Sequence, residues 1–73
     1  MNDDNEYRYG LLKRADTGRW AIDGQFEITS GDVIEVKIVD TWITTRIEHC
    51  GSDYYAVVPG IKLYGGMPAR MKI

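Results

Sequence analysis

Apolar and polar residues alternate with a period of two along most of the chain, in short runs separated by Gly, Pro, Ser and Asp. This alternation is typical of β-strands that are buried on one face, and no stretch shows the periodicity of an amphipathic helix. The runs predict strands over residues 6–14, 19–22, 25–29, 33–40, 42–50, 54–58 and 67–73. Residues 61–64 are expected to form a short strand or a single helical turn. Six or seven short antiparallel strands predict an all-β fold, and specifically a small SH3-like barrel, since closure removes exposed sheet edges.

The Asp-Gly pair at 23–24 separates two of these runs and is typical of a hairpin. A two-residue loop would place Trp20 and Ile22 on the face opposite Phe26. A three-residue loop instead pairs Ile22 with Phe26 and Trp20 with Ile28, so that all four large apolar side chains share one face. Because a slip of one residue would move these side chains to the other face, burial favours the three-residue loop.

A second hairpin is expected at residues 51–53, again with a three-residue loop, which pairs Cys50 with Tyr54. The strand before it is expected to face the core through Ile43, Thr45 and Ile47. This register predicts one shared surface formed by Trp42, Arg46, Tyr54 and Val58. It also predicts that the hairpin contributes Ile47, Tyr55 and Val57 to the core.

The last strand, residues 67–73, alternates in the same way. Its inward side chains are expected to be Met67, Ala69, Met71 and Ile73. Its outward bases, Arg70 and Lys72, with Lys62 nearby, are expected to form a solvated edge that discourages the addition of another strand. The alternative interpretation of these three bases is a small nucleic-acid footprint.

Seventy-three residues allow a single domain, predicted over residues 7–73 after a disordered tail at residues 1–6. One cysteine excludes an intrachain disulfide and favours a reducing compartment. The chain begins without the basic and apolar segments of a secretory signal and has no apolar run long enough for a membrane span. A soluble cytoplasmic protein is therefore expected. So small a core leaves self-association into a homo-oligomer open.

The residues that carry chemistry are few. His49 and Cys50 are adjacent on a strand, so they point to opposite faces and cannot act as base and nucleophile. One His and one Cys cannot supply the four ligands of a structural zinc site. The glycines match no phosphate-binding loop. We therefore expect no catalytic residue, no metal site, no cofactor and no enzymatic activity.

The net charge of −2 is unevenly distributed. All 11 acidic residues lie in residues 1–53, whereas residues 54–73 carry bases only: Lys62, Arg70 and Lys72. An overall acidic balance does not favour nucleic acid as the main partner. Trp, Tyr and Arg are the residue types enriched at binding hot spots, so the expected shared surface is a candidate binding site through Trp42, Arg46 and Tyr54.

Short segments along most of the chain carry a family resemblance: Gly10-Leu11, Gly18-Arg19-Trp20, Ser30 to Glu35, Trp42 with Thr45 to Glu48, and Tyr54-Tyr55. With these segments the run from Tyr9 to Ile73 resembles a family of short bacterial proteins known as a domain of unknown function. Members of that family are typically found on phages, plasmids and conjugative elements. The resemblance implies an SH3-like accessory protein of a mobile element, and it implies no functional residues.

These observations favour a non-catalytic module that binds another protein, encoded by the host or by the mobile element. One version of this role is an anti-defence protein. The first alternative is a single-stranded nucleic-acid-binding barrel that uses Trp42 and Tyr54 for stacking and Lys62, Arg70 and Lys72 for phosphate contacts. The second is a purely structural subunit of a homo-oligomer.

Overall fold

The computed structural model of the chain describes residues 6–51 and 53–73, in which seven strands form one antiparallel sheet without helices. The strands are β1 (Tyr7–Arg14), β2 (Trp20–Ile22), β3 (Phe26–Ile28), β4 (Val33–Ile38), β5 (Thr41–Cys50), β6 (Asp53–Ala56) and β7 (Pro68–Lys72). Their order in the sheet is β3-β2-β1-β7-β4-β5-β6. The predicted all-β fold of short antiparallel strands is confirmed. No helix capable of crossing a membrane occurs in the described part of the chain.

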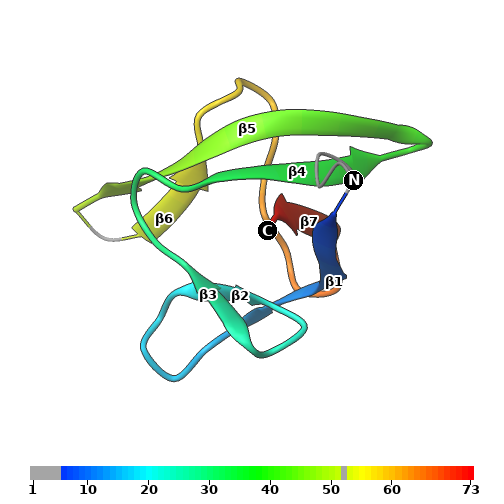
Figure 1. Cartoon of the computed structure of the whole chain (residues 1–73). Coiled ribbons are helices and arrows are strands. Elements are labelled where there is room, and N and C mark those ends of the chain that lie inside the picture. The colour runs from blue at the N-terminus through cyan, green and yellow to red at the C-terminus, as the bar shows by residue number, and fades with distance from the viewer. Residues whose placement is uncertain (1–5, 52) are drawn as a thin grey trace.

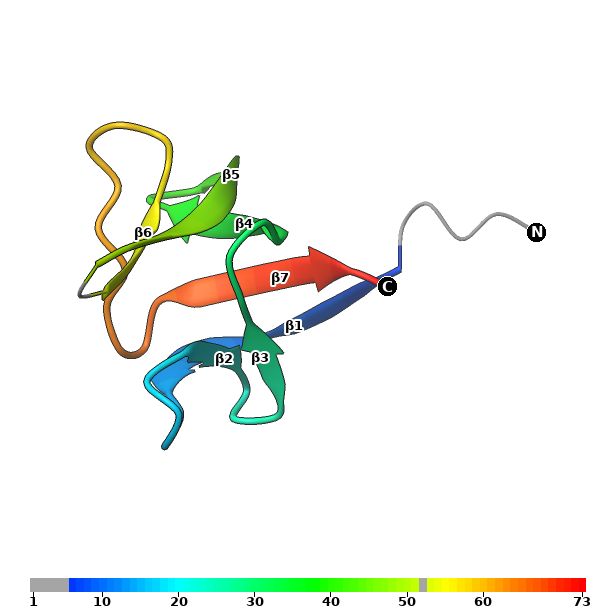
Figure 2. The ribbon, with the colours of Figure 1, turned by 90° about the vertical axis from the view of Figure 1, so that its left-hand side faces the viewer.

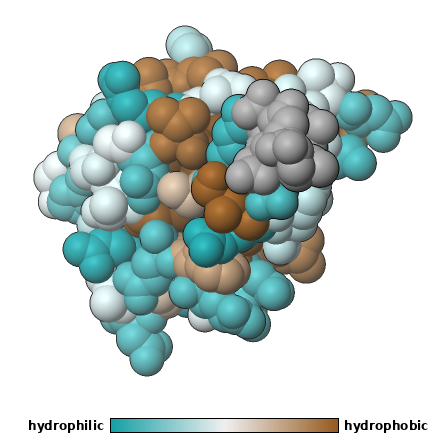
Figure 3. Space-filling model, viewed as in Figure 1, coloured by the Kyte–Doolittle hydropathy of each residue, from teal (hydrophilic) through white to brown (hydrophobic). Residues whose placement is uncertain are grey.

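The sheet curls into a barrel-like shape around one core, with β3 and β6 at its two ends (Figure 1). Inward side chains of all seven strands and of the segment before β7 meet there: Leu12, Trp20, Ile22, Ile28, Ile34, Val36, Ile47, Ala56, Met67 and Ala69. Figure 3 shows hydrophobic side chains reaching the surface in the middle of the same view, between β4–β5 above and β2–β3 below. The core thus lies on the inner face of the curled sheet, and the outer face points away from it.

β1 and β7 run side by side at the centre of the sheet, so the two ends of the described chain lie together (Figure 2). The amide of Ile73 donates to the carbonyl of Glu6 at 3.1 Å. Of the tail predicted over residues 1–6, residues 1–5 lie outside the described residues.

The β2–β3 hairpin has the register that burial favours. Trp20 pairs with Ile28 and Ile22 with Phe26, which confirms the three-residue loop. Asp23 takes φ 58° and Gly24 takes φ 70°, so the Asp-Gly pair provides the left-handed turn. Three of the four apolar side chains, Trp20, Ile22 and Ile28, are buried, and Phe26 packs against the core.

The loop of this hairpin crosses β1 at Gly10. The amide of Asp23 donates to the carbonyl of Leu11 at 3.0 Å. A Cβ on Gly10 would lie 2.6 Å from the Cβ of Asp23 and 2.9 Å from its amide nitrogen. Glycine is therefore required here for the close approach of two backbone segments.

The register predicted for the second hairpin is wrong by one residue. Cys50 pairs with Asp53 and Ile47 with Ala56, so the loop has two residues rather than three. Tyr54 and Ala56 therefore face inward, while Tyr55 faces outward and is 46% exposed. The expected core members Tyr55 and Val57 are both exposed, whereas Ile47 is buried as expected. Residues 54–58 are apolar on both faces, so burial could not decide the register.

The C-terminal strand is central rather than an edge. β7 pairs with β1 on one side and with β4 on the other. The expected solvated edge at Arg70 and Lys72 is therefore wrong. Residues 61–64 form neither strand nor helix, but Ile61 and Leu63 pack on the core. Ile73, expected inside, lies beyond the end of β7 and is exposed.

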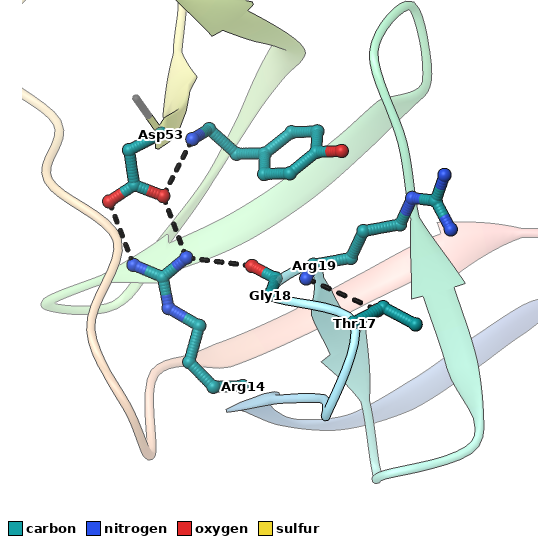
Figure 4. A network of polar contacts seen from close by, with 6 residues as sticks. Arg14, Thr17, Gly18, Arg19 and Asp53 are labelled. Carbon is teal, nitrogen blue, oxygen red and sulfur yellow. Dashed lines mark hydrogen bonds and ion pairs between the residues drawn. The ribbon is translucent and has the colours of Figure 1, made fainter. Parts of the chain in front are cut away.

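Strands β1 and β6 are not neighbours in the sheet, but the curl brings them close enough for side chains to connect them (Figure 4). Arg14, at the end of β1, donates two hydrogen bonds to the carboxylate of Asp53 in β6, at 2.7 and 2.9 Å. The same guanidinium lies 4.2 Å from the centre of the Trp20 ring and donates to the carbonyl of Gly18. The contact thus ties the β1–β2 turn to the start of β6.

A candidate binding surface on the outer sheet face

The central part of the outer sheet face is formed by the outward residues that lie in the β1–β7, β7–β4 and β4–β5 ladders. Its side chains are Tyr7, Tyr9 and Leu11 from β1, Pro68, Arg70 and Lys72 from β7, Val33, Glu35 and Lys37 from β4, and Trp42, Thr44 and Arg46 from β5. Most of the intervening residues point into the core, as period-two alternation requires, whereas Arg8 near the start of β1 and Ile38 at the end of β4 are exposed. The name outer face is used for the twelve outward side chains only.

Arg70 lies at the centre of the outer face, surrounded by aromatic rings. Its guanidinium carbon is 4.3 Å from the centre of the Tyr7 ring, 4.1 Å from that of Trp42 and 5.8 Å from that of Tyr9. Its Nε donates to Glu35, which pairs with it across β7 and β4, at 2.6 Å. We call these five residues the Arg70 cluster. Cation–π contacts on two rings and an ion pair hold the guanidinium in one position.

The aromatic rings also contact one another. Tyr9 lies edge-on to Trp42 with ring centres 6.2 Å apart, and Tyr7 is tilted against Tyr9 at 5.9 Å. Trp42 is half-buried, whereas Tyr9 is 57% exposed. The cluster is therefore a packed layer on the outside of the sheet, and Tyr9 forms its most accessible part.

The charges of the outer face are mostly basic. Four of its side chains are bases, and Glu35 is its one acid. Arg70 is paired with Glu35, and Arg46 is paired with Glu48 at 2.7 Å. Within residues 6–51 and 53–73, Lys37 and Lys72 form no ion pair with a carboxylate. The face therefore carries positive charge on a molecule whose net charge is −2.

Large apolar side chains are exposed around the Arg70 cluster. Leu11 on β1 and Val33 on β4 are each more than half exposed. A hollow of about 210 Å³ lies between β1, β7 and β4, lined in part by Tyr7, Val33 and Arg70. Exposed apolar side chains beside a packed Trp, Tyr and Arg cluster are the kind of groups that interaction sites use.

The structure places two of the three aromatic and arginine candidates on this face. Trp42 and Arg46 both project outward from β5. Tyr54 does not join them, because the one-residue difference in register turns it inward. Its ring is tilted by 50° against that of His49, with ring centres 4.5 Å apart. The predicted surface of Trp42, Arg46, Tyr54 and Val58 is therefore not formed.

The three C-terminal bases are also separated. Arg70 and Lys72 lie on the outer face, whereas Lys62 lies in the segment between β6 and β7, outside the sheet. Lys62 lines a small hollow with Arg14 and Tyr55. The three bases therefore do not form one common site.

Sequence reasoning missed Tyr7, Tyr9 and Glu35 as parts of the site. Their alternation places Tyr7, Tyr9 and Leu11 on one face of β1, but only the sheet order shows that this face adjoins Arg70. Within the described ranges, no three His, Cys, Asp or Glu side chains are grouped so that they could hold a metal ion. Cys50 is exposed at the end of β5.

One of the comparisons with known proteins identifies a family. A family model described as a domain of unknown function, DUF5348, matches residues 9–71. The chain belongs to the DUF5348 family. No curated protein and no solved structure matches the chain. The match covers the sheet except for Tyr7 and Arg8 at the start of β1 and Lys72 at the end of β7. It therefore includes the outer face apart from Tyr7 and Lys72.

Proposed function

We propose that this DUF5348 protein is a non-catalytic binding module of SH3-like type that docks another protein in the cytoplasm through its outer face. One form of this role is an accessory of a phage or plasmid that inhibits a bacterial defence protein. The observation that carries the proposal is the exposure of Tyr9, Leu11 and Val33 around a packed Trp and Arg. Interface hot spots favour this combination of aromatic, Arg and apolar groups.

The position of the face supports the proposal. β1, β7, β4 and β5 are joined by continuous ladders, so the face is carried by the centre of the sheet rather than by a loop. The ion pair and the ring contacts hold Arg70 and Trp42 in place before a partner binds. Side chains that are already ordered lose little entropy on binding, which favours affinity.

A single-stranded nucleic acid is the second candidate, and the excess of bases on the outer face favours it. Stacking on bases requires free ring faces. Tyr7 and Trp42 each have the guanidinium of Arg70 over the ring, which leaves Tyr9 as the most accessible aromatic group. The arrangement therefore supports a protein partner better than a base-stacking platform.

Site-specific photo-cross-linking tests the proposal. A photoreactive phenylalanine analogue is placed at Tyr9 and, as a matched control, at Tyr55, an exposed tyrosine on the outward side of β6. In host cells, position 9 is expected to form a cross-link to one protein and position 55 to form none. Equal cross-linking at both positions, or none at position 9, would contradict the proposal. A cross-link to a second copy of this chain would instead support a homo-oligomer.

A further inference from the structure

Two lysine side chains of the outer face lack a carboxylate partner among the described residues. Lys37 on β4 and Lys72 on β7 form no ion pair in the described part of the chain. Lys37 lies 5.8 Å from the ring centre of Trp42, and Lys72 lines the hollow beside Arg70. The other two bases of the face have carboxylate partners. Any charge-specific contact of this face is therefore made mainly by Lys37 and Lys72.

The strand register fixes where these two lysines lie. Arg70 and Glu35 are opposite each other, and β7 and β4 are antiparallel. Lys72 is two residues beyond Arg70, and Lys37 is two residues beyond Glu35, so they lie on opposite sides of the Arg70 cluster. At about 3.3 Å per residue and about 4.8 Å between strands, their Cα atoms are about 14 Å apart.

We infer that the segment docked on the outer face is an extended acidic peptide of the partner protein. In such a segment every second side chain points to the same face, and residues four apart are separated by about 13 Å. Two carboxylates four residues apart would reach Lys37 and Lys72. The residue midway between them, if apolar, would contact Tyr9 and Trp42. The expected pattern is acid, any residue, apolar, any residue, acid; this inference rests on the proposed function.

Selection from a displayed library of random 12-residue peptides tests the inference. Three baits are compared: the wild-type protein, the Lys37→Glu/Lys72→Glu variant, and Lys62→Glu as a control for surface charge. The wild-type protein and Lys62→Glu are expected to enrich the acid–apolar–acid pattern. The double variant is expected to lose that enrichment, and to bind a selected peptide at least about tenfold more weakly by fluorescence titration. Circular dichroism establishes that each bait is folded.

Each other outcome has a definite meaning. Peptides enriched without the acidic pattern, or bound equally by the double variant, would overturn the inference and leave a docking surface in place. Binding of fifteen-residue oligothymidylate that is lost in the double variant would overturn it in favour of nucleic acid. If no peptide is enriched, the inference fails, and cross-linking at position 9 then decides independently whether the outer face docks a protein at all.

Discussion

At the scale of single residues, the outer face depends on Arg70. Its side chain is 19% exposed, is paired with Glu35 and lies over two aromatic rings. From the sequence, Arg70 could be predicted to point outward from its strand, but its neighbours could not. Those neighbours come from β1, β4 and β5, and only the sheet order brings them together. A base expected to be solvated is thus the centre of a packed cluster.

Replacing Arg70 by Lys is expected to lower the free energy of unfolding by about 1–2 kcal/mol. Lys keeps the charge but loses the planar group that stacks on Tyr7 and Trp42, and each such contact contributes about 0.5–1 kcal/mol. Arg46→Lys is the matched control, because Arg46 is exposed and its pair with Glu48 is expected to contribute less than about 1 kcal/mol. Urea denaturation measures both variants. Equal stabilities for the two variants would show that the stacking contributes little.

At the scale of elements, the two hairpins show when a sequence determines register. In β2–β3 the large apolar residues lie on one face only, so a single register buries them, and it was predicted correctly. In β5–β6 the residues Tyr54 to Val57 are apolar on both faces, so the pattern allowed either loop. The wrong register placed Tyr54 on the candidate surface, whereas the observed register turns it to the inner side of the sheet. The existence of the strands was predictable, whereas this register was not.

Gly10→Ala is expected to destabilise the fold by about 1–3 kcal/mol, the range found for overpacked sites. The new Cβ would lie 2.6 Å from the Cβ of Asp23, and the backbone of the β2–β3 loop would have to move. Gly65→Ala is the control: nothing lies within 4 Å of its Cβ position, so a change below about 0.5 kcal/mol is expected. Chemical denaturation compares the two. If both substitutions have the same small effect, the close approach at Gly10 is not limiting.

At the scale of the whole molecule, the order of the strands decides what the protein presents to a partner. Alternation, turn residues and chain length predicted an all-β fold of short antiparallel strands. The placement of β7 between β1 and β4 depends on pairings between distant parts of the chain, which local patterns do not encode. The outer face exists because of that placement. The contact of Arg14 with Asp53, 39 residues apart, is long-range in the same way.

Acid is expected to weaken this long-range contact. Hydrogen bonds from Arg14, and then from the amide of Tyr54, lower the pKa of Asp53 from 3.8 to about 2. Because the pKa is lower in the folded state than in the unfolded chain, the folded state favours the charged carboxylate. The resulting stabilisation is complete above about pH 5 and is lost as the pH falls towards about 2. Exposure of both side chains keeps the effect small and sensitive to salt.

Asp53→Asn removes this titration while keeping the size of the side chain, so its effect must depend on pH. The wild-type protein is expected to be more stable than the variant at about pH 6, and the difference is expected to shrink towards about pH 2 as Asp53 becomes protonated. Asp40→Asn, in an exposed turn, is the control, since Asp40 forms no ion pair within the described ranges. Urea midpoints over this pH range give the measurement. A difference for Asp53→Asn that stays constant with pH would mean that its pair with Arg14 does not join the two halves of the sheet electrostatically.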